Sequence, residues 1–316
     1  MIQVRSTNGG QDCGKEYYMA HYRAELTGVF GDPVDDNPTM ILEEAGYNAL
    51  DLNYRYLTIK VLPEDLETAM GAVRAMHFRG INLTMPHKIK VIPMLDELTE
   101  AARIIGAVNT VINDDGRLTG ENTDGKGFTR SLMREGIDLQ GKKIMILGAG
   151  GAARAIAVEC ALSGAREILI ANRTESSGRE LSELVRTKTK AASEYIPWAG
   201  TAADGANKAG ESALRIPADT DILINATPVG FTPNQDQMPD IDYDTICEGM
   251  IVSDVVFDPA ETKFLKEAAK RGAKTFTGIG MLVQQGALNF TLWTGEDAPV
   301  DVMYEALEKE LAQNRA

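Results

Sequence analysis

An apolar run, Lys143-Ile-Met-Ile-Leu147, leads directly into Gly148-Ala-Gly150-Gly-Ala-Ala153 and an alanine-rich helical pattern. A G-x-G-x-x-(G/A) motif between a strand and a helix is typical of a Rossmann dinucleotide-binding unit. Gly148 permits the tight turn, Gly150 lets the backbone approach a pyrophosphate, and Ala153 is small enough for the helix to pack closely on the strand. The free N–H groups at the helix start attract the anion. The alternative is a glycine-rich turn without a ligand. We expect dinucleotide contacts at Gly148, Ala149, Gly150, Gly151 and Ala152.

The residues that follow the next predicted strand, 167–171, bear on the choice of cofactor. An NAD site commonly has Asp or Glu there, about 20 residues after the glycines, to bind the ribose hydroxyls. This chain has Asn172, Arg173 and Thr174 instead. A guanidinium pairs with a 2′-phosphate, and amide and hydroxyl side chains add hydrogen bonds, so we predict NADP in preference to NAD. The alternative for Arg173 is an exposed loop charge.

Strand and helix patterns alternate on both sides of the glycine turn and predict an α/β fold built on parallel strands. Asp114-Asp-Gly116 lies between two strand-like runs and predicts a hairpin. Residues 198–216 show no readable pattern, and the polar residues 1–23 are typical of an added arm. Strands are expected over 26–30, 54–61, 81–84, 107–113, 117–120, 142–147, 167–171, 221–225, 251–256 and 274–277. Helices are expected over 38–46, from Pro63 to about Arg79 with Gly80 as the stop, over 93–105, after the turn in 148–164, and over 175–187, 262–272, 280–293 and 300–312.

Length and composition exclude several classes of protein. At roughly 150 residues per domain, 316 residues suggest two domains. A formal net charge of −14 disfavours a nucleic-acid partner. No apolar run approaches the ~20 residues of a membrane span, and the N-terminus lacks a secretory signal pattern, so we expect a cytoplasmic protein. The three cysteines lack a C-x-x-C spacing and the three histidines are scattered, which predicts neither a disulfide framework nor a metal site.

Polar residues gather beside the predicted strands of the N-terminal half. They lie in Asn82-Leu-Thr84-Met-Pro-His-Lys88, Gly106-Ala-Val-Asn109-Thr and Gly120-Glu-Asn122-Thr-Asp124-Gly. Loops at the carboxyl ends of strands are where open α/β sheets hold ligands. Hydride transfer to or from a carbinol carbon needs a group that moves the hydroxyl proton, and Lys88 beside Asp124 could do this. The alternatives are a surface lysine and an ordinary Asn-Thr-Asp-Gly turn.

Seven blocks resemble the shikimate/quinate dehydrogenase family, in the family's order and from about Ala24 to the final helices. They are 82–88, 96–101, 106–110, 122–124, the Gly148 turn with 172–174, Asn225-Ala-Thr-Pro-Val-Gly230 and Gly278-Ile-Gly-Met281-Leu-Val-Gln-Gln285. The resemblance implies reversible NADP-dependent hydride transfer, with NAD possible, to a ring carbon of shikimate or quinate. For shikimate this is a step of aromatic amino acid biosynthesis. Features such as Phe290-Thr-Leu-Trp-Thr-Gly295 look closer to the quinate/shikimate branch.

The resemblance also implies roles for single residues. The positions of Lys88 and Asp124 match the family's catalytic pair. Substrate contacts are implied at Asn37, Asn82, Thr84, Asn109 and Gln285. Cofactor contacts on the nicotinamide side are implied at Asn225, Thr227, Pro228, Val255, Gly278 and Met281. The implied domains are an arm (1–23), a substrate-binding and catalytic domain (24–125 with the returning helices of 281–316) and a Rossmann NADP-binding domain (126–280), in a possible homodimer.

Two departures from the family pattern affect the substrate. The family's Ser-x-Ser-Pro, whose hydroxyls hold the substrate carboxylate, is replaced within Gly31-Asp-Pro-Val-Asp35-Asp36-Asn37-Pro38. A tyrosine is replaced by Phe257. The alternatives are therefore a paralogue acting on another cyclic polyol or keto compound, a methylene-tetrahydrofolate dehydrogenase-like enzyme, and a non-catalytic NADP-binding sensor.

Overall fold

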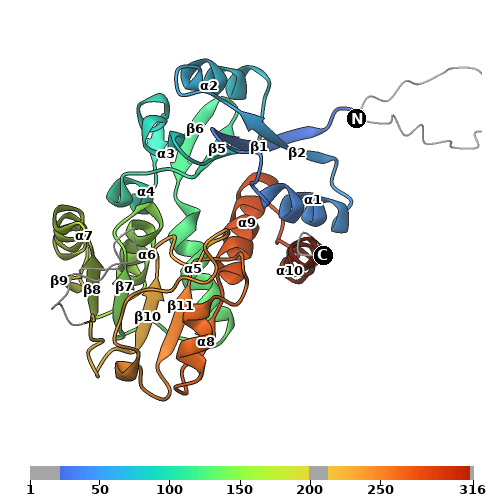
Figure 1. Ribbon diagram of the computed structural model, residues 1–316. Helices are drawn as coiled ribbons and strands as arrows, with labels where there is room; N and C mark the ends of the chain where they lie inside the picture. Colours follow the sequence, from blue (N-terminus) through green and yellow to red (C-terminus); the bar gives the residue numbers. More distant parts are fainter. Residues whose placement is uncertain (1–21, 199–212, 314–316) are drawn as a thin grey trace, which may run out of the picture.

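The computed structural model describes residues 22–198 and 213–313. Nearly all of the expected arm, Cys13 and most of the unreadable 198–216 segment lie outside these residues. The described chain forms two lobes, each built on a six-stranded sheet (Figure 1). None of its helices combines the length and apolar character needed to cross a membrane.

The first lobe holds a mixed sheet in the order β2-β1-β3-β5-β6-β4. Parallel pairing joins β1 to both β2 and β3, whereas β5 runs antiparallel to β3 and to β6. The predicted hairpin is confirmed as β5 and β6. The strands are β1 (Glu25–Gly31), β2 (Tyr54–Lys60), β3 (Gly80–Leu83), β4 (Glu97–Leu98), β5 (Thr110–Asp114) and β6 (Arg117–Glu121). The helices between them are α1 (Thr39–Ala49), α2 (Leu66–Ala75), α3 (His87–Lys90), the 3-10 turn η1 (Ile92–Met94) and α4 (Glu100–Ile105).

The second lobe holds a fully parallel sheet in the order β12-β11-β10-β7-β8-β9, as expected of a Rossmann fold. Its central strands are buried on both faces, which explains their continuous apolar sequences. The strands are β7 (Lys143–Leu147), β8 (Glu167–Asn172), β9 (Ala192–Pro197), β10 (Ile222–Asn225), β11 (Ile251–Asp254) and β12 (Lys274–Phe276). The helices are α6 (Gly151–Leu162), α7 (Glu175–Lys188), the 3-10 turn η2 (Tyr243–Thr245) and α8 (Lys263–Ala269).

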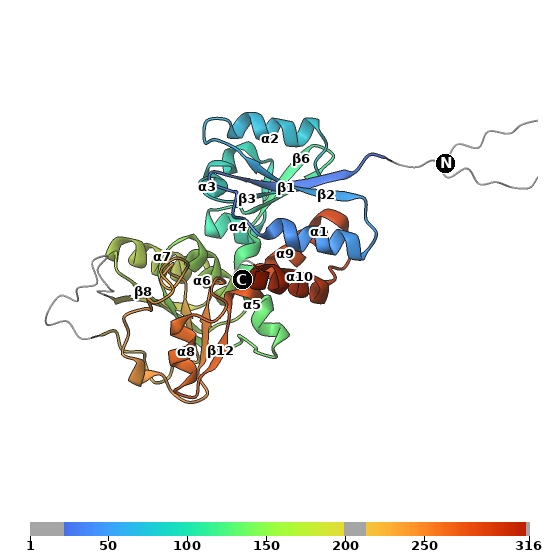
Figure 2. The ribbon, with the colours of Figure 1, turned by 45° about the vertical axis from the view of Figure 1, so that its right-hand side comes forward.

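Three helices connect the lobes. Helix α5 (Thr123–Arg134) leaves the first sheet and packs on α6 and on α9 (Gly278–Thr294), and α10 (Val300–Gln313) packs on α1. Figure 2 shows α9 and α10, from the end of the chain, beside α1 from its beginning. Leu42, Phe290 and Met303 share one apolar cluster there. The expected return of the C-terminal helices to the first lobe is thus confirmed.

Gly80 does not end a helix, and this prediction is wrong. Helix α2 ends at Ala75, and His77 reverses the chain with a φ of 54°. Gly80 instead begins β3, where a Cβ atom would lie 1.9 Å from Nε1 of Trp293 and 2.3 Å from the carbonyl oxygen of Val111. The glycine therefore makes room for an indole on the face of the sheet.

The helix predicted from Pro93 is also wrong in its first half. Leu95 is extended, and Asp96 accepts a hydrogen bond from the backbone N–H of Leu118 at 2.7 Å. These contacts draw 97–98 into the sheet as β4. Helix α4 begins only at Glu100, where the hydroxyl of Thr99 caps it. Helix α5 and strand β9 were not predicted.

Candidate active site

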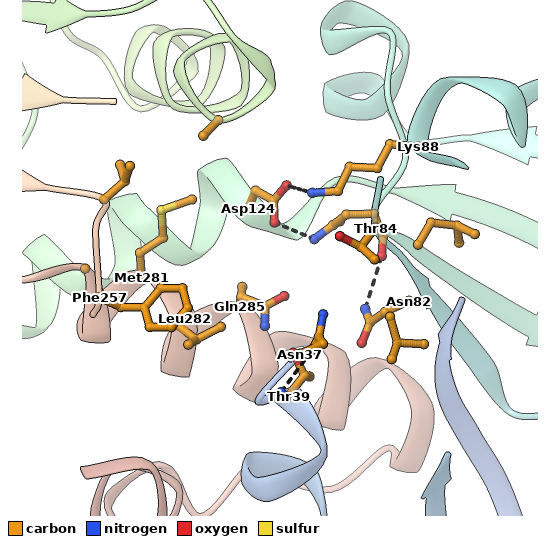
Figure 3. Close-up of a pocket in the computed structure, with 16 residues that line it drawn as sticks. Asn37, Thr39, Asn82, Thr84, Lys88, Asp124, Phe257, Met281, Leu282 and Gln285 are labelled. Atoms are coloured by element: carbon orange, nitrogen blue, oxygen red, sulfur yellow. Dashed lines mark hydrogen bonds and ion pairs between the residues drawn. The ribbon is translucent and has the colours of Figure 1, made fainter. Parts of the chain in front are cut away.

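A cavity of about 210 Å³ lies between the two lobes (Figure 3). The first sheet supplies its polar side chains, while α9 and the loop after β11 supply most of its apolar ones. It is lined by Val29, Asn37, Thr39, Asn82, Leu83, Thr84, Lys88, Asn109, Asp124, Ala152, Val255, Phe257, Gly278, Met281, Leu282 and Gln285.

Lys88 and Asp124 meet in this cavity. Nζ of Lys88 donates to Oδ2 of Asp124 at 2.6 Å, and the side chains are 32% and 18% exposed. Nδ2 of Asn109 donates to the other carboxylate oxygen, Oδ1, at 2.8 Å. Asp124 also lies in the first turn of α5, where the helix dipole favours a negative charge. A lysine held this way can exchange a proton with a bound hydroxyl group while its carboxylate partner keeps a fixed position.

A buried polar network fixes this arrangement from behind. The side chain of Asn109 accepts a 2.7 Å hydrogen bond from the backbone N–H of Thr123, next to Asp124. Asn289 accepts from the hydroxyls of Thr123 and Thr110 at 2.9 and 2.8 Å, and donates to Oε1 of Gln285 at 3.3 Å. The network joins β5, α5 and α9, so the two lobes share the structure that holds the pair.

The opposite wall carries amides and hydroxyls. Asn82 accepts from the hydroxyl of Tyr56 at 2.8 Å and donates to the carbonyl of Asn109 at 3.1 Å. Thr84 lies over Gly31, where any Cβ would clash with its methyl group at 2.3 Å. The side chains on this wall are therefore held in place before any ligand binds.

A second cavity, of about 140 Å³, surrounds the glycine turn. Gly148 has a φ of +111°, a conformation that favours glycine, and a Cβ there would lie 2.9 Å from the carbonyl oxygen of Ala226. At Gly150 and Gly151 a Cβ would meet no atom within 4 Å. This space beside the start of α6 fits a pyrophosphate. The cavity is lined by Gly148, Ala149, Gly150, Asn172, Arg173, Trp198, Ala226, Thr227, Pro228, Val229 and Pro239.

Asn225 supports the site without lining it. It is fully buried, accepts from the N–H and hydroxyl of Thr227, and donates to Asp254 at 3.0 Å. Burial raises the pKa of Asp254 to about 7, while hydrogen bonds from Val256, Thr262 and Asn225 oppose the rise. Asp254 and Asn225 thereby shape the loops that follow β10 and β11.

The structure brings most of the expected site residues together at one of the two cavities. Gly151, Thr174 and Asn225 line neither cavity. The first cavity has Asn37, Asn82, Thr84, Lys88, Asn109, Asp124, Ala152, Val255, Gly278, Met281 and Gln285. The second has Gly148, Ala149, Gly150, Asn172, Arg173, Thr227 and Pro228.

The sequence reasoning missed several contributors. Thr39 and Leu282 line the first cavity and Trp198 lines the second. Asn289 could have been found, because it follows Gln285 by four residues on the same helix face. Trp198 could not, because it ends a segment without a readable pattern. No three His, Cys, Asp or Glu side chains gather as a metal site within 22–198 and 213–313.

Family models match three segments of the chain. The model described as "Shikimate dehydrogenase substrate binding domain" matches residues 29–111. "Shikimate / quinate 5-dehydrogenase" matches 131–197, and "Shikimate 5'-dehydrogenase C-terminal domain" matches 278–308. The substrate-domain match contains Lys88 and Asn109, and the other two matches contain the glycine turn and Gln285.

Individual relatives match almost the whole chain. A shikimate dehydrogenase (NADP(+)) of Desulforamulus reducens is 41% identical over 93% of this chain and 100% of its own. A shikimate 5-dehydrogenase of Listeria monocytogenes, solved with shikimate and NAD, has a TM-score of 0.82 and 35% identity, covering 94% of this chain and 100% of its own. A ligand-free 5-ketofructose reductase of a Gluconobacter species has a TM-score of 0.85 and 40% identity, covering 92% of this chain and 100% of its own.

Proposed function

Because the chain belongs to the shikimate/quinate dehydrogenase family, we propose that it transfers hydride reversibly between NADP and a secondary alcohol carbon of a polyhydroxylated compound. It is an NADP-dependent oxidoreductase of the shikimate dehydrogenase type. The observation that carries the proposed mechanism is the 2.6 Å contact between Lys88 and Asp124 in a cavity that also reaches the start of α6. A non-catalytic sensor and a folate-type dehydrogenase lose their support from this family membership.

The cofactor fits the residues beside the glycine turn. Gly150 and Gly151 leave room for a pyrophosphate, and Arg173 lies in the same cavity, where a guanidinium suits a 2′-phosphate. NADP supplies the hydride acceptor or donor when bound. We infer that Val255, Gly278 and Met281, which line the first cavity, contact its nicotinamide end.

The proton is the task of the chain's own residues. Oxidation of an alcohol releases a hydroxyl proton, and reduction of a ketone consumes one. We propose that Lys88 exchanges this proton and that Asp124, fixed by Asn109, orients the amine. Asn82, Thr84 and Gln285 line the same cavity with amides and a hydroxyl suited to substrate hydroxyl groups.

Two substrate classes are supported. Shikimate or quinate comes first, because curated relatives are shikimate dehydrogenases and a solved relative binds shikimate. A keto compound without a carboxylate comes second, because the 5-ketofructose reductase is 40% identical and the loop 32–38 lacks the family's two serines. The division into residues 24–125 with 281–316 and residues 126–280, homodimer formation and a cytoplasmic location stay predictions.

The proposal is tested by replacing the amine. Lys88→Ala should lower kcat by about 10²- to 10⁴-fold with little change in KM, as for loss of a general acid–base group. Lys90→Ala on the same short helix is the matched control, because its side chain is exposed and lines neither cavity described above. The rate is followed through the absorbance of NADPH. An unchanged kcat in Lys88→Ala would remove the proposed role.

A further inference from the structure

A third cavity adjoins the site between the lobes. It has a volume of about 860 Å³ and lies along the loop 32–38, α1 and the end of α10. It shares Asn37, Thr39, Thr84, Lys88, Phe257 and Leu282 with the cavity that holds the Lys88–Asp124 pair. A ligand at the pair therefore feels the charges that line both cavities.

These charges are strongly one-sided. Asp35, Asp36, Asp258 and Glu310 line the third cavity, and the aspartates of the loop 32–38 are exposed. Among the described residues that line the two cavities, Lys88 is the one cationic side chain. It is paired with Asp124 at 2.6 Å, so its charge is already balanced. We call the four carboxylates Asp35, Asp36, Asp258 and Glu310 the acidic rim.

Asn37 presents a neutral hydrogen-bond donor beside this rim. Its Oδ1 accepts from the backbone N–H of Thr39 at 3.0 Å, which fixes the side chain at the start of α1. Within the described chain Nδ2 has no partner, and Figure 3 shows the side chain entering the cavity from the α1 side. The apolar ring of Phe257, packed edge-on against Phe231, forms the wall nearby. This end of the site thus has one amide donor, an apolar ring and carboxylates, but no free cation among its described residues.

We propose that the acidic rim and Asn37 select an uncharged polyhydroxylated substrate and disfavour one that carries a carboxylate. The inference rests on the proposed oxidoreductase function and narrows its substrate class. A substrate carboxylate would be repelled by the rim, because walls of low dielectric strengthen the field of like charges. Hydroxyl groups, in contrast, donate hydrogen bonds to carboxylates, which only accept them.

The sharpest probe pair is shikimate and its methyl ester, which share the ring and differ in the charge. With the wild-type holoenzyme and NADP, we expect kcat/KM for the ester to exceed that for shikimate by about tenfold or more. Raising the salt concentration should narrow the gap by increasing kcat/KM for shikimate alone, because salt screens exposed charges. A panel of neutral keto-hexoses and cyclic keto-polyols, assayed with NADPH, extends the comparison.

Neutralising the rim tests its part directly. The double variant Asp35→Asn/Asp36→Asn should bring the two kcat/KM values closer together by raising that for shikimate, and Glu64→Gln, an exposed acid outside the cavities, should change neither. Equal or better use of shikimate by the wild type, or an unchanged ratio in the double variant, would overturn the inference and leave the proposed function standing. Failure to turn over any compound of either class would contradict the proposed function, and the inference with it.

Discussion

Glu159 makes the stability of the protein depend on pH in a way that can be worked out from its surroundings. It lies in α6, where that helix packs against α5, and it is 6% exposed. A Cβ atom on Gly125 of α5 would lie 2.7 Å from its Cγ, and its Oε1 has no hydrogen-bond partner among the described residues. Burial raises the pKa of Glu159 to about 7, opposed by the charge of Lys126 and reinforced by that of Glu121.

The direction of the effect follows from proton binding. Between pH 4.5 and about 7 the folded protein keeps a proton on Glu159 that the unfolded chain has lost. The group therefore stabilises the fold fully below about pH 4.5, and this contribution is lost as the pH rises to about 7. At 1.36 kcal/mol for each pKa unit, the difference between 4.5 and about 7 amounts to about 3 kcal/mol.

Glu159→Gln keeps the shape and removes the titration. We expect the variant and the wild type to have similar free energies of unfolding near pH 5, and the variant to be more stable by up to about 3 kcal/mol near pH 8.5. Urea denaturation followed by tryptophan fluorescence measures both, because Trp198 and Trp293 lie in the cores of different lobes. Glu194→Gln, at an exposed position of β9, is the control. A stability difference that is the same at both pH values would refute the reasoning.

Two further substitutions test the cofactor site and the first lobe. Arg173→Ala should raise KM for NADP by about tenfold or more and leave KM for NAD unchanged, because the guanidinium pairs with the 2′-phosphate alone; an equal rise for both cofactors would contradict this. Gly80→Ala should lower the free energy of unfolding by about 1–3 kcal/mol, since the new methyl group must displace Trp293. Gly71→Ala, inside α2 with no atom within 4 Å of the new Cβ, should be neutral or stabilising in the same thermal denaturation assay.

The nucleotide-binding lobe could be predicted almost element by element. Its strands β7, β8 and β10 are short apolar runs because both faces of a parallel sheet are covered, and each run is bounded by glycine or polar residues. The glycine turn needed only its neighbours in sequence to be read, since strand, turn and helix are consecutive. Strand β9 was missed because it is an edge strand with exposed residues such as Glu194, so it lacks the apolar pattern.

Helix α5 shows why local patterns failed elsewhere. Asn122-Thr-Asp-Gly suggests a turn, but Oδ1 of Asn122 accepts from the N–H of Asp124 and caps a helix instead. Gly125 and Gly127 lower helix propensity, yet both are required by packing. A Cβ at Gly125 would lie 2.3 Å from the carbonyl oxygen of Ala155, and one at Gly127 would lie 2.7 Å from the backbone nitrogen of Gln285. Contacts with residues distant in sequence therefore outweigh propensity at this position.

The same argument explains how Asn109 reaches the catalytic pair. It precedes β5, so by sequence it belongs to the amino end of a strand, away from the edge where parallel strands collect ligands. Because β5 runs antiparallel to β3, Thr110 pairs with Asn82 and brings Asn109 beside the carboxyl end of β3, which leads to Lys88. Because β6 runs antiparallel to β5, Thr110 also pairs with Glu121, and the chain continues from there to Asp124. One hairpin thus turns three separate segments toward a single point, and the site depends on that reversal as much as on the residues themselves.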